Sequence, residues 1–176
     1  MTGANGPRTV DEWGRLRGLA AEQQEGGDRS GNRGWVSTER SRHLRGRRSR
    51  NTKPEITLRH AVHRLGLRYR LHRQVAPRCT SDFALPRHRI AVFVDGCFWH
   101  GCPTHGASVH RGPNAERWAE KITANKARDR RNTAAAEAAG WTVARVWECE
   151  VRTDPESAAK RILQLSIRTT KSSTAP

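Results

Sequence analysis

"RIAVFVDG", residues 89–96, is a run of apolar side chains that ends in an aspartate and a glycine. A continuous apolar run of this length is typical of a strand that is buried on both faces. Strands of this kind lie in the middle of a sheet that carries helices on both sides. The stretch therefore predicts an α/β fold with this strand at the centre of its sheet.

The segments before this strand predict a helix and two further strands. "TKPEITLRHAVHRLG" (52–66) has apolar residues at helical spacing and ends at a glycine, and Thr52 and Glu55 have the spacing of a capping box. "LRYRLHRQV" (67–75) alternates apolar with basic residues, which predicts one half-buried strand with a basic outer face. "SDFALPRHR" (81–89) predicts a short strand and a turn that begins with proline.

The segments after it predict a long helix, a strand and a last helix. Asn114 has a suitable side chain to cap a helix that continues to Gly140. "WTVARVWE" (141–148) predicts a strand, and Asp154 and Pro155 begin a helix over "DPESAAKRILQLSI". We expect a disordered basic arm over 1–36, the folded domain over 37–155, and a C-terminal helix and tail over 156–176.

Length and charge limit the possible functions. The chain has 176 residues, enough for one domain of ordinary size, and a formal net charge of +16. This excess of Lys and Arg indicates a polyanionic partner, most simply nucleic acid, although an arginine-rich bacterial protein without such a partner is the alternative. The sequence has neither an apolar run of transmembrane length nor a secretory signal, which predicts a cytoplasmic protein without membrane contact.

The stretch "VDGCFWHGCPTH" (94–105) is rich in cysteine and histidine. In a reducing compartment such a cluster indicates metal ligands rather than disulfides. Together with Cys149 it offers three thiolates and an imidazole, the closed set of a structural zinc site: Cys97, Cys102, His105 and Cys149. The alternative is a group of reduced, buried cysteines. Cys79 lies outside the cluster and is expected to be a plain thiol.

His100 is left over once zinc has four ligands. Its imidazole can take a proton from water, although such a histidine is more often structural. Hydrolysis of a phosphodiester also needs a divalent cation held by oxygen ligands. Asp82 and the backbone at Val94 and Asp95 provide such oxygens if their strands pair.

Two further acidic residues have alternative roles. Asp129 either orients His100 or pairs with the neighbouring Arg128 and Arg130. Glu55 either reaches the metal site from the start of its helix or serves only in the capping box.

Several motifs together resemble the very short patch repair (Vsr) DNA mismatch endonucleases. They are "TKPE", "GLRYRLHR", "AVFVDGCFWHGCPTH", "NAERW", "KITANKARDRR" and "GWTVARVWE", in this order. The resemblance covers about residues 47–150, and its "DGCFWHGCP" core is highly specific. It implies a restriction-endonuclease-like core of the PD-(D/E)XK type, with helices flanking a central mixed sheet. The implied reaction is a magnesium-dependent nick in one DNA strand next to a T:G mismatch, which arises when 5-methylcytosine deaminates.

The resemblance also implies roles for single residues. Asp82 and the carbonyl of Val94 match magnesium ligands, His100 matches the general base, and Asp129 and Glu55 match acidic residues of that site. Ahead of Asp82, "APRCTSDFA" departs from the Gly- and Pro-containing lead that the family often has. If Asp82 is displaced, the protein is a non-catalytic, zinc-containing DNA-binding protein. The other alternative is a restriction-type nuclease of the same fold.

Aromatic and cysteine residues match two further features of the family. The aromatics that enter the base stack beside the mismatch correspond to Phe98, Trp99 and Trp118. Unstacking costs least at a mismatch, so such a wedge selects the lesion. The zinc ligands correspond to Cys97, Cys102 and Cys149, with His105 in the remaining place at slightly altered spacing.

Basic residues complete the expected DNA interface. The side chains expected to contact phosphates are Arg47, Arg48, Arg50, Arg68 and Arg70. The expected partner is double-stranded DNA with a T:G mismatch, bound by a monomer near the bacterial nucleoid. Mismatch-repair proteins and a cytosine-5 DNA methyltransferase are expected functional links.

Overall fold

The structure is a computed structural model that describes Val36, residues 49–106 and residues 113–172. The chain divides into two units, Met1–Trp35 and Val36–Pro176, and all described residues lie in the second. Apart from Val36, the expected arm lies outside the described residues, as do Arg47 and Arg48. Within the described part, no helix has the length and apolarity needed to cross a membrane.

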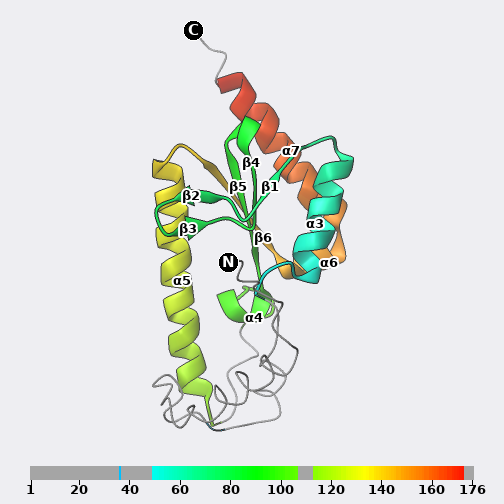
Figure 1. Ribbon diagram of the computed structural model, residues 1–176. Coiled ribbons are helices and arrows are strands. Elements are labelled where there is room, and N and C mark those ends of the chain that lie inside the picture. Colours follow the sequence, from blue (N-terminus) through cyan, green and yellow to red (C-terminus); the bar gives the residue numbers. More distant parts are fainter. Residues whose placement is uncertain (1–35, 37–48, 107–112, 173–176) are drawn as a thin grey trace, which may run out of the picture. The chain divides into compact units, whose positions relative to one another are not determined.

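The described chain contains both helices and strands (Figure 1). In order they are α3 (Lys53–Arg64), β1 (Arg70–Leu71), β2 (Gln74–Ala76), β3 (Cys79–Thr80), β4 (Phe83–Leu85), the 3-10 helix η1 (Pro86–His88), β5 (Ile90–Asp95), α4 (Cys97–His100), α5 (Ala115–Ala138), β6 (Thr142–Trp147), α6 (Glu148–Thr153) and α7 (Pro155–Ser172). Helix α5 ends before Gly140, whose φ of +77° is easily adopted only by glycine. The predicted long helix and the predicted strand β6 are therefore confirmed.

The larger sheet is mixed and has β5 in its interior. Its strand order is β1-β4-β5-β6, in which β1, β4 and β5 are antiparallel and β5 and β6 are parallel. Strand β5 is buried at every position except Val94, which is half-buried. The α/β class, the mixed sheet and the central position of "RIAVFVDG" are thus confirmed. The parallel register pairs Val94 with Val146 and Asp95 with Trp147, so both strands deliver their carboxyl ends to the same edge.

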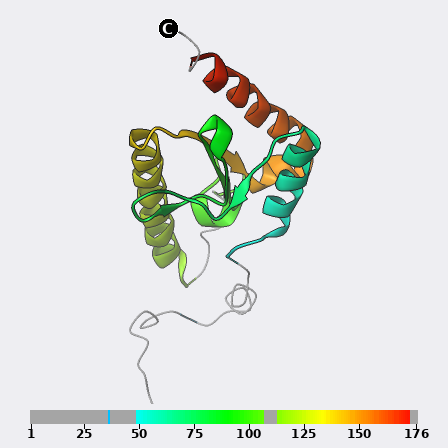
Figure 2. The ribbon, with the colours of Figure 1, turned by 45° about the horizontal axis from the view of Figure 1, so that its top comes forward.

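Helices cover both faces of this sheet (Figures 1 and 2). Side chains alternate between the faces of a strand, so neighbouring residues belong to different cores. Phe83, Ile90 and Val92 pack with α3, α6 and α7 in one core. Ala84, Ala91 and Phe93 face the other way and pack with α5 and the β2–β3 hairpin. The small alanines on that face let the long helix approach closely.

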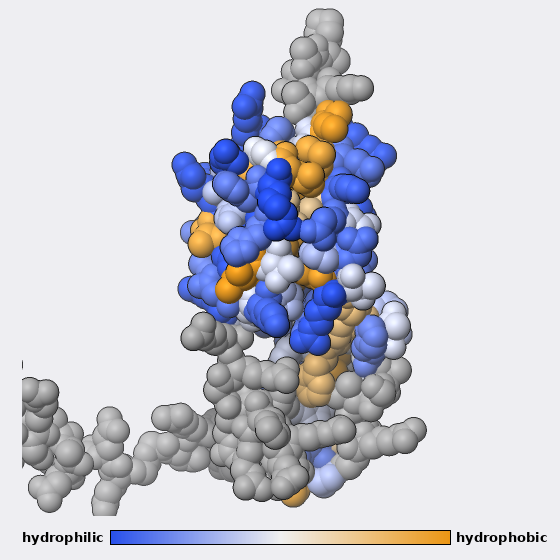
Figure 3. Space-filling model, turned by 90° about the vertical axis from the view of Figure 1, so that its right-hand side faces the viewer, coloured by the Kyte–Doolittle hydropathy of each residue, from blue (hydrophilic) through white to orange (hydrophobic). Residues whose placement is uncertain are grey.

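Helix α7 belongs to the first of these cores. Ala158, Ala159 and Ile162 are buried against α3 and the sheet. The Asp154 carboxylate accepts a hydrogen bond from the Ser157 N–H at 2.9 Å, so Asp154 and Pro155 begin the helix as predicted. The outer face of α3 and α7 is chiefly hydrophilic, with a few apolar residues gathered on it (Figure 3).

The prediction of one strand over residues 67–75 was wrong. His72 has a φ of +46°, and this left-handed conformation interrupts the extended chain. The two halves become β1 and β2, which lie in different sheets. Leu71, expected to be on the buried face, is 47% exposed. Alternation of apolar and basic residues does not reveal such a break.

Two predicted helix caps were also wrong in detail. The Glu55 carboxylate accepts hydrogen bonds from the Asn51 N–H at 2.9 Å and the Thr52 hydroxyl at 2.8 Å, whereas Thr52 makes no side-chain cap. The Asn114 side chain does not cap α5 but pairs with both backbone groups of Val36, at 2.9 and 2.7 Å. Both helices still begin where expected.

Candidate active site

A hollow of about 1190 Å³ lies at the carboxyl ends of the two parallel strands. The start of α3, the end of β5, helix α4 and one face of α5 line it. All residues predicted for the catalytic and magnesium site are among its lining residues: Glu55, Asp82, Val94, His100 and Asp129. Crevices beyond the carboxyl ends of strands are common ligand sites in open α/β sheets. The structure therefore brings the predicted residues together in one place.

His100 and Asp129 are in direct contact. His100 ends the short helix α4, and Asp129 lies on α5, with 2.5 Å between His100 Nδ1 and Asp129 Oδ2. Burial raises the pKa of Asp129, but the hydrogen bond and charge of His100, and then the charges of Arg145 and Arg128, outweigh burial and lower it. The contact with His100 supports the orienting role over pairing with Arg128 or Arg130. Because Nδ1 is engaged, Nε2 is the ring nitrogen that can exchange a proton with water.

Asp95 and Arg145 belong to the same group, and neither side chain was predicted from the sequence. Asp95 is buried at the end of β5, with its side chain 7% exposed, and its Oδ1 lies 3.5 Å from Nδ1 of His100. Arg145 on β6 donates two hydrogen bonds to it, at 2.6 and 2.7 Å. Burial lowers the pKa of Arg145, but the bond and charge of Asp95 outweigh burial and raise it, so the guanidinium stays charged. A charged residue within the apolar strand "WTVARVWE" was the available signal.

Asp82 lies directly before β4 and lines the hollow. Its Oδ2 accepts a hydrogen bond from the Val94 N–H at 2.7 Å, and its own N–H donates to the Val92 carbonyl at 3.1 Å. Burial, followed by the charges of Glu55 and Asp95, raises the pKa of Asp82 to about 6, although the Val94 N–H lowers it. The carboxylates of Glu55, Asp82 and Asp95 are among those that line the hollow. They suit a hard divalent cation, which prefers oxygen ligands and favours their ionised form.

Three aromatic side chains pack edge to face beside the hollow. Phe98 and Trp99 lie on α4, and Trp118 lies near the start of α5. Their ring centroids are 4.9 to 5.6 Å apart, and the Lys121 ammonium lies 5.5 Å from the ring centroids of both tryptophans. The amide of Asn125 donates to the Trp99 carbonyl at 2.8 Å. All three aromatics are half-buried. Their ring contacts bring the residues of the predicted wedge together in one cluster.

The cysteine and histidine cluster forms a possible metal centre next to α4. One ligand atom from each of Cys97, Cys102, His105 and Cys149 lies within 4.8 Å of the others. Ligands at about 2.3 Å from a tetrahedral zinc are about 3.8 Å apart. Cys102 Sγ lies 3.8 Å from Cys149 Sγ and 3.7 Å from His105 Nδ1, which fits that geometry. Cys149 lies in the first turn of α6, directly after β6.

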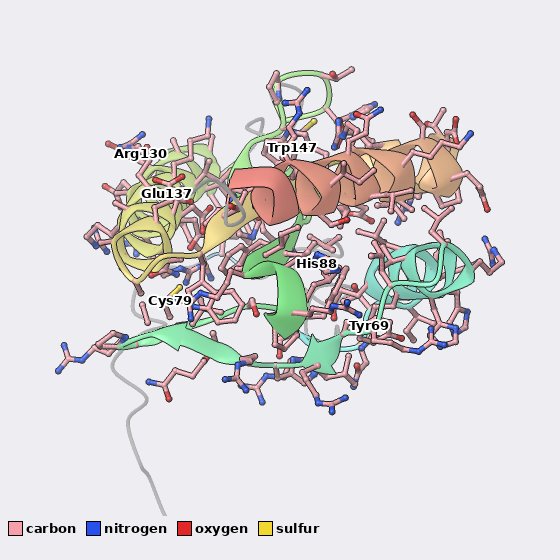
Figure 4. All side chains as sticks on the ribbon, turned by 90° about the horizontal axis from the view of Figure 1, so that it is seen from above. Tyr69, Cys79, His88, Arg130, Glu137 and Trp147 are labelled. Carbon is pink, nitrogen blue, oxygen red and sulfur yellow. The ribbon has the colours of Figure 1, made fainter. Side chains whose placement is uncertain are left out.

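The thiols of this cluster differ in acidity. Burial and the neighbouring Cys149 thiol raise the pKa of Cys97 to about 12. Burial also raises the pKa of Cys102, but hydrogen bonds from the backbone and side chain of His105 outweigh it and lower the value to about 6. A bound zinc ion stabilises every thiolate that coordinates it. Cys79 lies apart from the cluster and beside α5, where its Sγ approaches the Asn132 carbonyl at 3.5 Å (Figure 4).

Three of the predicted phosphate contacts belong to the described residues, and they lie outside the hollow. Arg50, Arg68 and Arg70 are exposed, and none is among the residues that line it. Five other cations do line it: Lys53, Lys121, Arg128, Arg145 and Arg152. These cations could not be singled out from the sequence, because basic residues are frequent along the whole chain and only the fold shows which ones surround the site.

Comparison with known proteins identifies the family. Residues 35–105 match the family model described as DNA mismatch endonuclease Vsr. The type II nicking enzyme V.XorIIP of Xanthomonas oryzae is 46% identical over 119 residues, which cover 66% of this chain and 85% of that protein. The type II nicking enzyme V.NaeI of Lentzea aerocolonigenes is 40% identical, covering 68% and 73%. The DNA mismatch endonuclease Vsr of Escherichia coli is 35% identical, covering 64% and 71%.

These matches place the protein among endonucleases that act on DNA. It belongs to the Vsr family. Among solved structures, the catalytic domain of the homing endonuclease I-Bth0305I has a TM-score of 0.46 and 18% identity, with 68% of this chain and 98% of that one covered.

Proposed function

We propose that this protein is a magnesium-dependent DNA endonuclease that nicks one strand next to T:G mismatches, the lesions left when 5-methylcytosine deaminates. The observation that carries the proposal is the hollow in which Asp82, His100 and Asp129 meet beside an aromatic cluster. The nicking part is supported by relatives that are themselves named nicking enzymes. The mismatch part is supported by the relative named a mismatch endonuclease.

The chain's own residues divide the hydrolytic step between them. His100 takes a proton from the attacking water at Nε2, and Asp129 holds the opposite ring nitrogen at 2.5 Å. Asp82 and the carbonyl of Val94 would hold magnesium, and Glu55 would be a further carboxylate near it. When bound, magnesium stabilises the negative charge that grows on the scissile phosphate.

Recognition rests on the aromatic cluster. Phe98, Trp99 and Trp118 form a wedge that enters the base stack, at a cost of a few kcal/mol that is lowest at a mismatch. Trp99 precedes His100 directly, so a base step opened by the wedge lies beside the group that activates water. The four-residue cluster would hold a structural zinc ion, which would fix α4, the helix that carries Phe98, Trp99 and His100.

The mixed strand order also supports the restriction-endonuclease-like architecture. We further propose that the enzyme acts as a monomer, because one hollow cuts one strand, and that it works alongside mismatch-repair proteins and a cytosine-5 DNA methyltransferase in bacteria. Methylation creates the base whose deamination gives the T:G lesion.

The test uses end-labelled duplexes that differ only in one T:G or C:G pair, incubated with magnesium. We expect a nick only in the T-containing strand of the T:G duplex, and loss of that nick in Asp82→Ala. Equal cutting of both duplexes would favour a restriction-type nuclease. Binding without cutting by the wild type would favour a non-catalytic DNA-binding protein.

A further inference from the structure

Arg145 connects the two carboxylates that meet at His100. It lies on β6, where the parallel register places it beside Phe93 of β5, two residues before Asp95. Its guanidinium lies over the Phe93 ring, 5.2 Å from the centroid. The side chain is half-buried between the sheet and α5, on the wall of the hollow.

The guanidinium of Arg145 is directed to protein acceptors. It donates hydrogen bonds to both Asp95 oxygens at 2.6 and 2.7 Å, to the Asp129 carbonyl at 3.4 Å and to the Thr133 hydroxyl at 3.3 Å. It also forms an ion pair with Asp129 Oδ1 at 3.3 Å. All three guanidinium nitrogens therefore donate within the protein. These contacts favour a role within the protein over contact with a DNA phosphate.

Asp129 is therefore held at both of its oxygens. Oδ2 lies 2.5 Å from His100 Nδ1, and Oδ1 lies 3.3 Å from the Arg145 guanidinium. Asp95 approaches the same Nδ1 at 3.5 Å. Two carboxylates this close to one ring nitrogen repel each other unless a cation lies between them. The fork of Arg145 supplies that cation and also fixes the plane of each carboxylate.

We infer that Arg145, together with Asp95, positions His100 for catalysis by fixing the Asp129 carboxylate. Nδ1 then carries the proton, and Nε2 is the nitrogen directed to water. The inference rests on the proposed role of His100 as the base. Arg145 is a positioning residue, since it acts through Asp129 and does not touch DNA.

The first experiment measures steady-state nicking of a T:G duplex by Arg145→Met. We expect kcat to fall about 10- to 100-fold, because a small misplacement of a catalytic group is enough for such a loss, with KM unchanged within about twofold. The matched control is Arg161→Met, which breaks a bidentate pair with Glu150 on the exposed side of α7. It should leave both constants unchanged. A raised KM with unchanged kcat would mean that Arg145 contacts DNA, and would overturn the inference.

A second variant separates positioning from stability. Arg145→Met leaves Asp95 buried without its partner, which destabilises the fold. In the double variant Asp95→Asn, Arg145→Gln the buried charges are gone, so the melting temperature should recover while kcat stays low. Recovery of kcat together with the melting temperature would overturn the inference.

A third readout does not need activity. The ring 15N shifts of His100, recorded at one alkaline pH, should indicate a single Nδ1–H tautomer in the wild type and a mixture in Arg145→Met. Unchanged shifts would overturn the inference while leaving the proposed function in place. If the wild type does not nick DNA but the shifts respond, the proposed function fails and the positioning of the imidazole stands.

Discussion

The backbone N–H of Val94 donates a hydrogen bond of 2.7 Å to Oδ2 of Asp82. This bond ties the carboxylate to the end of β5 although Asp82 precedes the first residue of β4. The unusual lead "APRCTSDFA" therefore does not remove Asp82 from the hollow. This geometry favours the catalytic proposal over a DNA-binding protein that lacks its metal aspartate.

Asp82→Asn should stabilise the magnesium-free protein at neutral pH. Burial, then Glu55 and Asp95, raise the pKa of Asp82 from 3.8 to about 6, so the folded state holds the proton more tightly than the unfolded state. The stability that this proton gives the folded wild type is fully present below pH 3.8. Up to about 3 kcal/mol of that free energy of unfolding is lost as the pH rises through 6. The asparagine keeps an acceptor for Val94 and has no such loss.

Denaturant unfolding of both proteins between pH 4 and 8 measures this difference. Groups common to both proteins, including the zinc ligands, cancel in the comparison. The advantage of Asp82→Asn should grow with pH and shrink when magnesium is added, because only the wild type binds the ion. Parallel pH profiles would contradict the raised pKa.

His100→Gln should lower the nicking rate by about 10²- to 10⁴-fold, the usual contribution of a general base. DNA affinity and zinc content should remain, since neither depends on this imidazole. The measurement is single-turnover nicking of the T:G duplex, with His60→Gln on the exposed face of α3 as the control. A variant that nicks at the wild-type rate would remove His100 from the mechanism.

The fold was predictable where one physical signal dominated. The apolar run at β5 and the glycine stop at Gly140 specified a buried strand and the end of a helix. At His72, by contrast, a left-handed φ splits an alternating segment into strands of two sheets. A positive φ is uncommon for any residue other than glycine, so the residue types in this segment do not predict the break.

The residues of the site could be predicted from the sequence, but the contacts between them could not. His100, Asp82 and Asp129 follow from their residue types and from the family resemblance, and they do share one hollow. The pairing of Asp95 with Arg145 depends on the parallel register of β5 and β6, which brings Phe93 opposite Arg145. The register between two strands that a long helix separates cannot be predicted from a single sequence.

Zinc should contribute to stability through Cys149, which joins α6 to the loop after β5. Cys149→Ser should lose the metal and lower the free energy of unfolding by several kcal/mol. A loss of about 3 kcal/mol corresponds to about 6–12 °C in melting temperature for a chain of this size. Cys79→Ala is the matched control, since that thiol is buried outside the cluster. Metal analysis should find zinc in the control alone, and zinc in both would contradict the ligand set.

Arginines outside and inside the hollow should both affect the salt dependence of DNA binding, to different extents. If Arg68 and Arg70 each contact a phosphate, replacing both with glutamine should lower the slope of log K against log salt by about 2. Arg128→Gln should lower it by about 1, because Arg128 lines the hollow. Arg168→Gln, on the exposed side of α7, should leave it unchanged. An unchanged slope for the variant in which both Arg68 and Arg70 are replaced would exclude these two residues from the DNA interface.

Trp118→Leu should weaken discrimination of the mismatch more than it weakens DNA binding as such. The three-ring cluster holds Trp118 edge to face against Phe98 and Trp99, with centroids 4.9 and 5.6 Å away. A leucine keeps the apolar contact but cannot stack on a base, and base–aromatic stacking is worth about 1–3 kcal/mol. Affinity for the T:G duplex should therefore fall about 5- to 150-fold, with little change for the matched duplex. Trp118→Phe, which keeps an aromatic ring, should retain most of the preference.

Fluorescence of a 2-aminopurine placed beside the mismatch reports directly whether the base step is opened. The fluorescence should rise when the wild type binds and stay low with Trp118→Leu. An equal rise with both proteins would mean that the step opens without this ring.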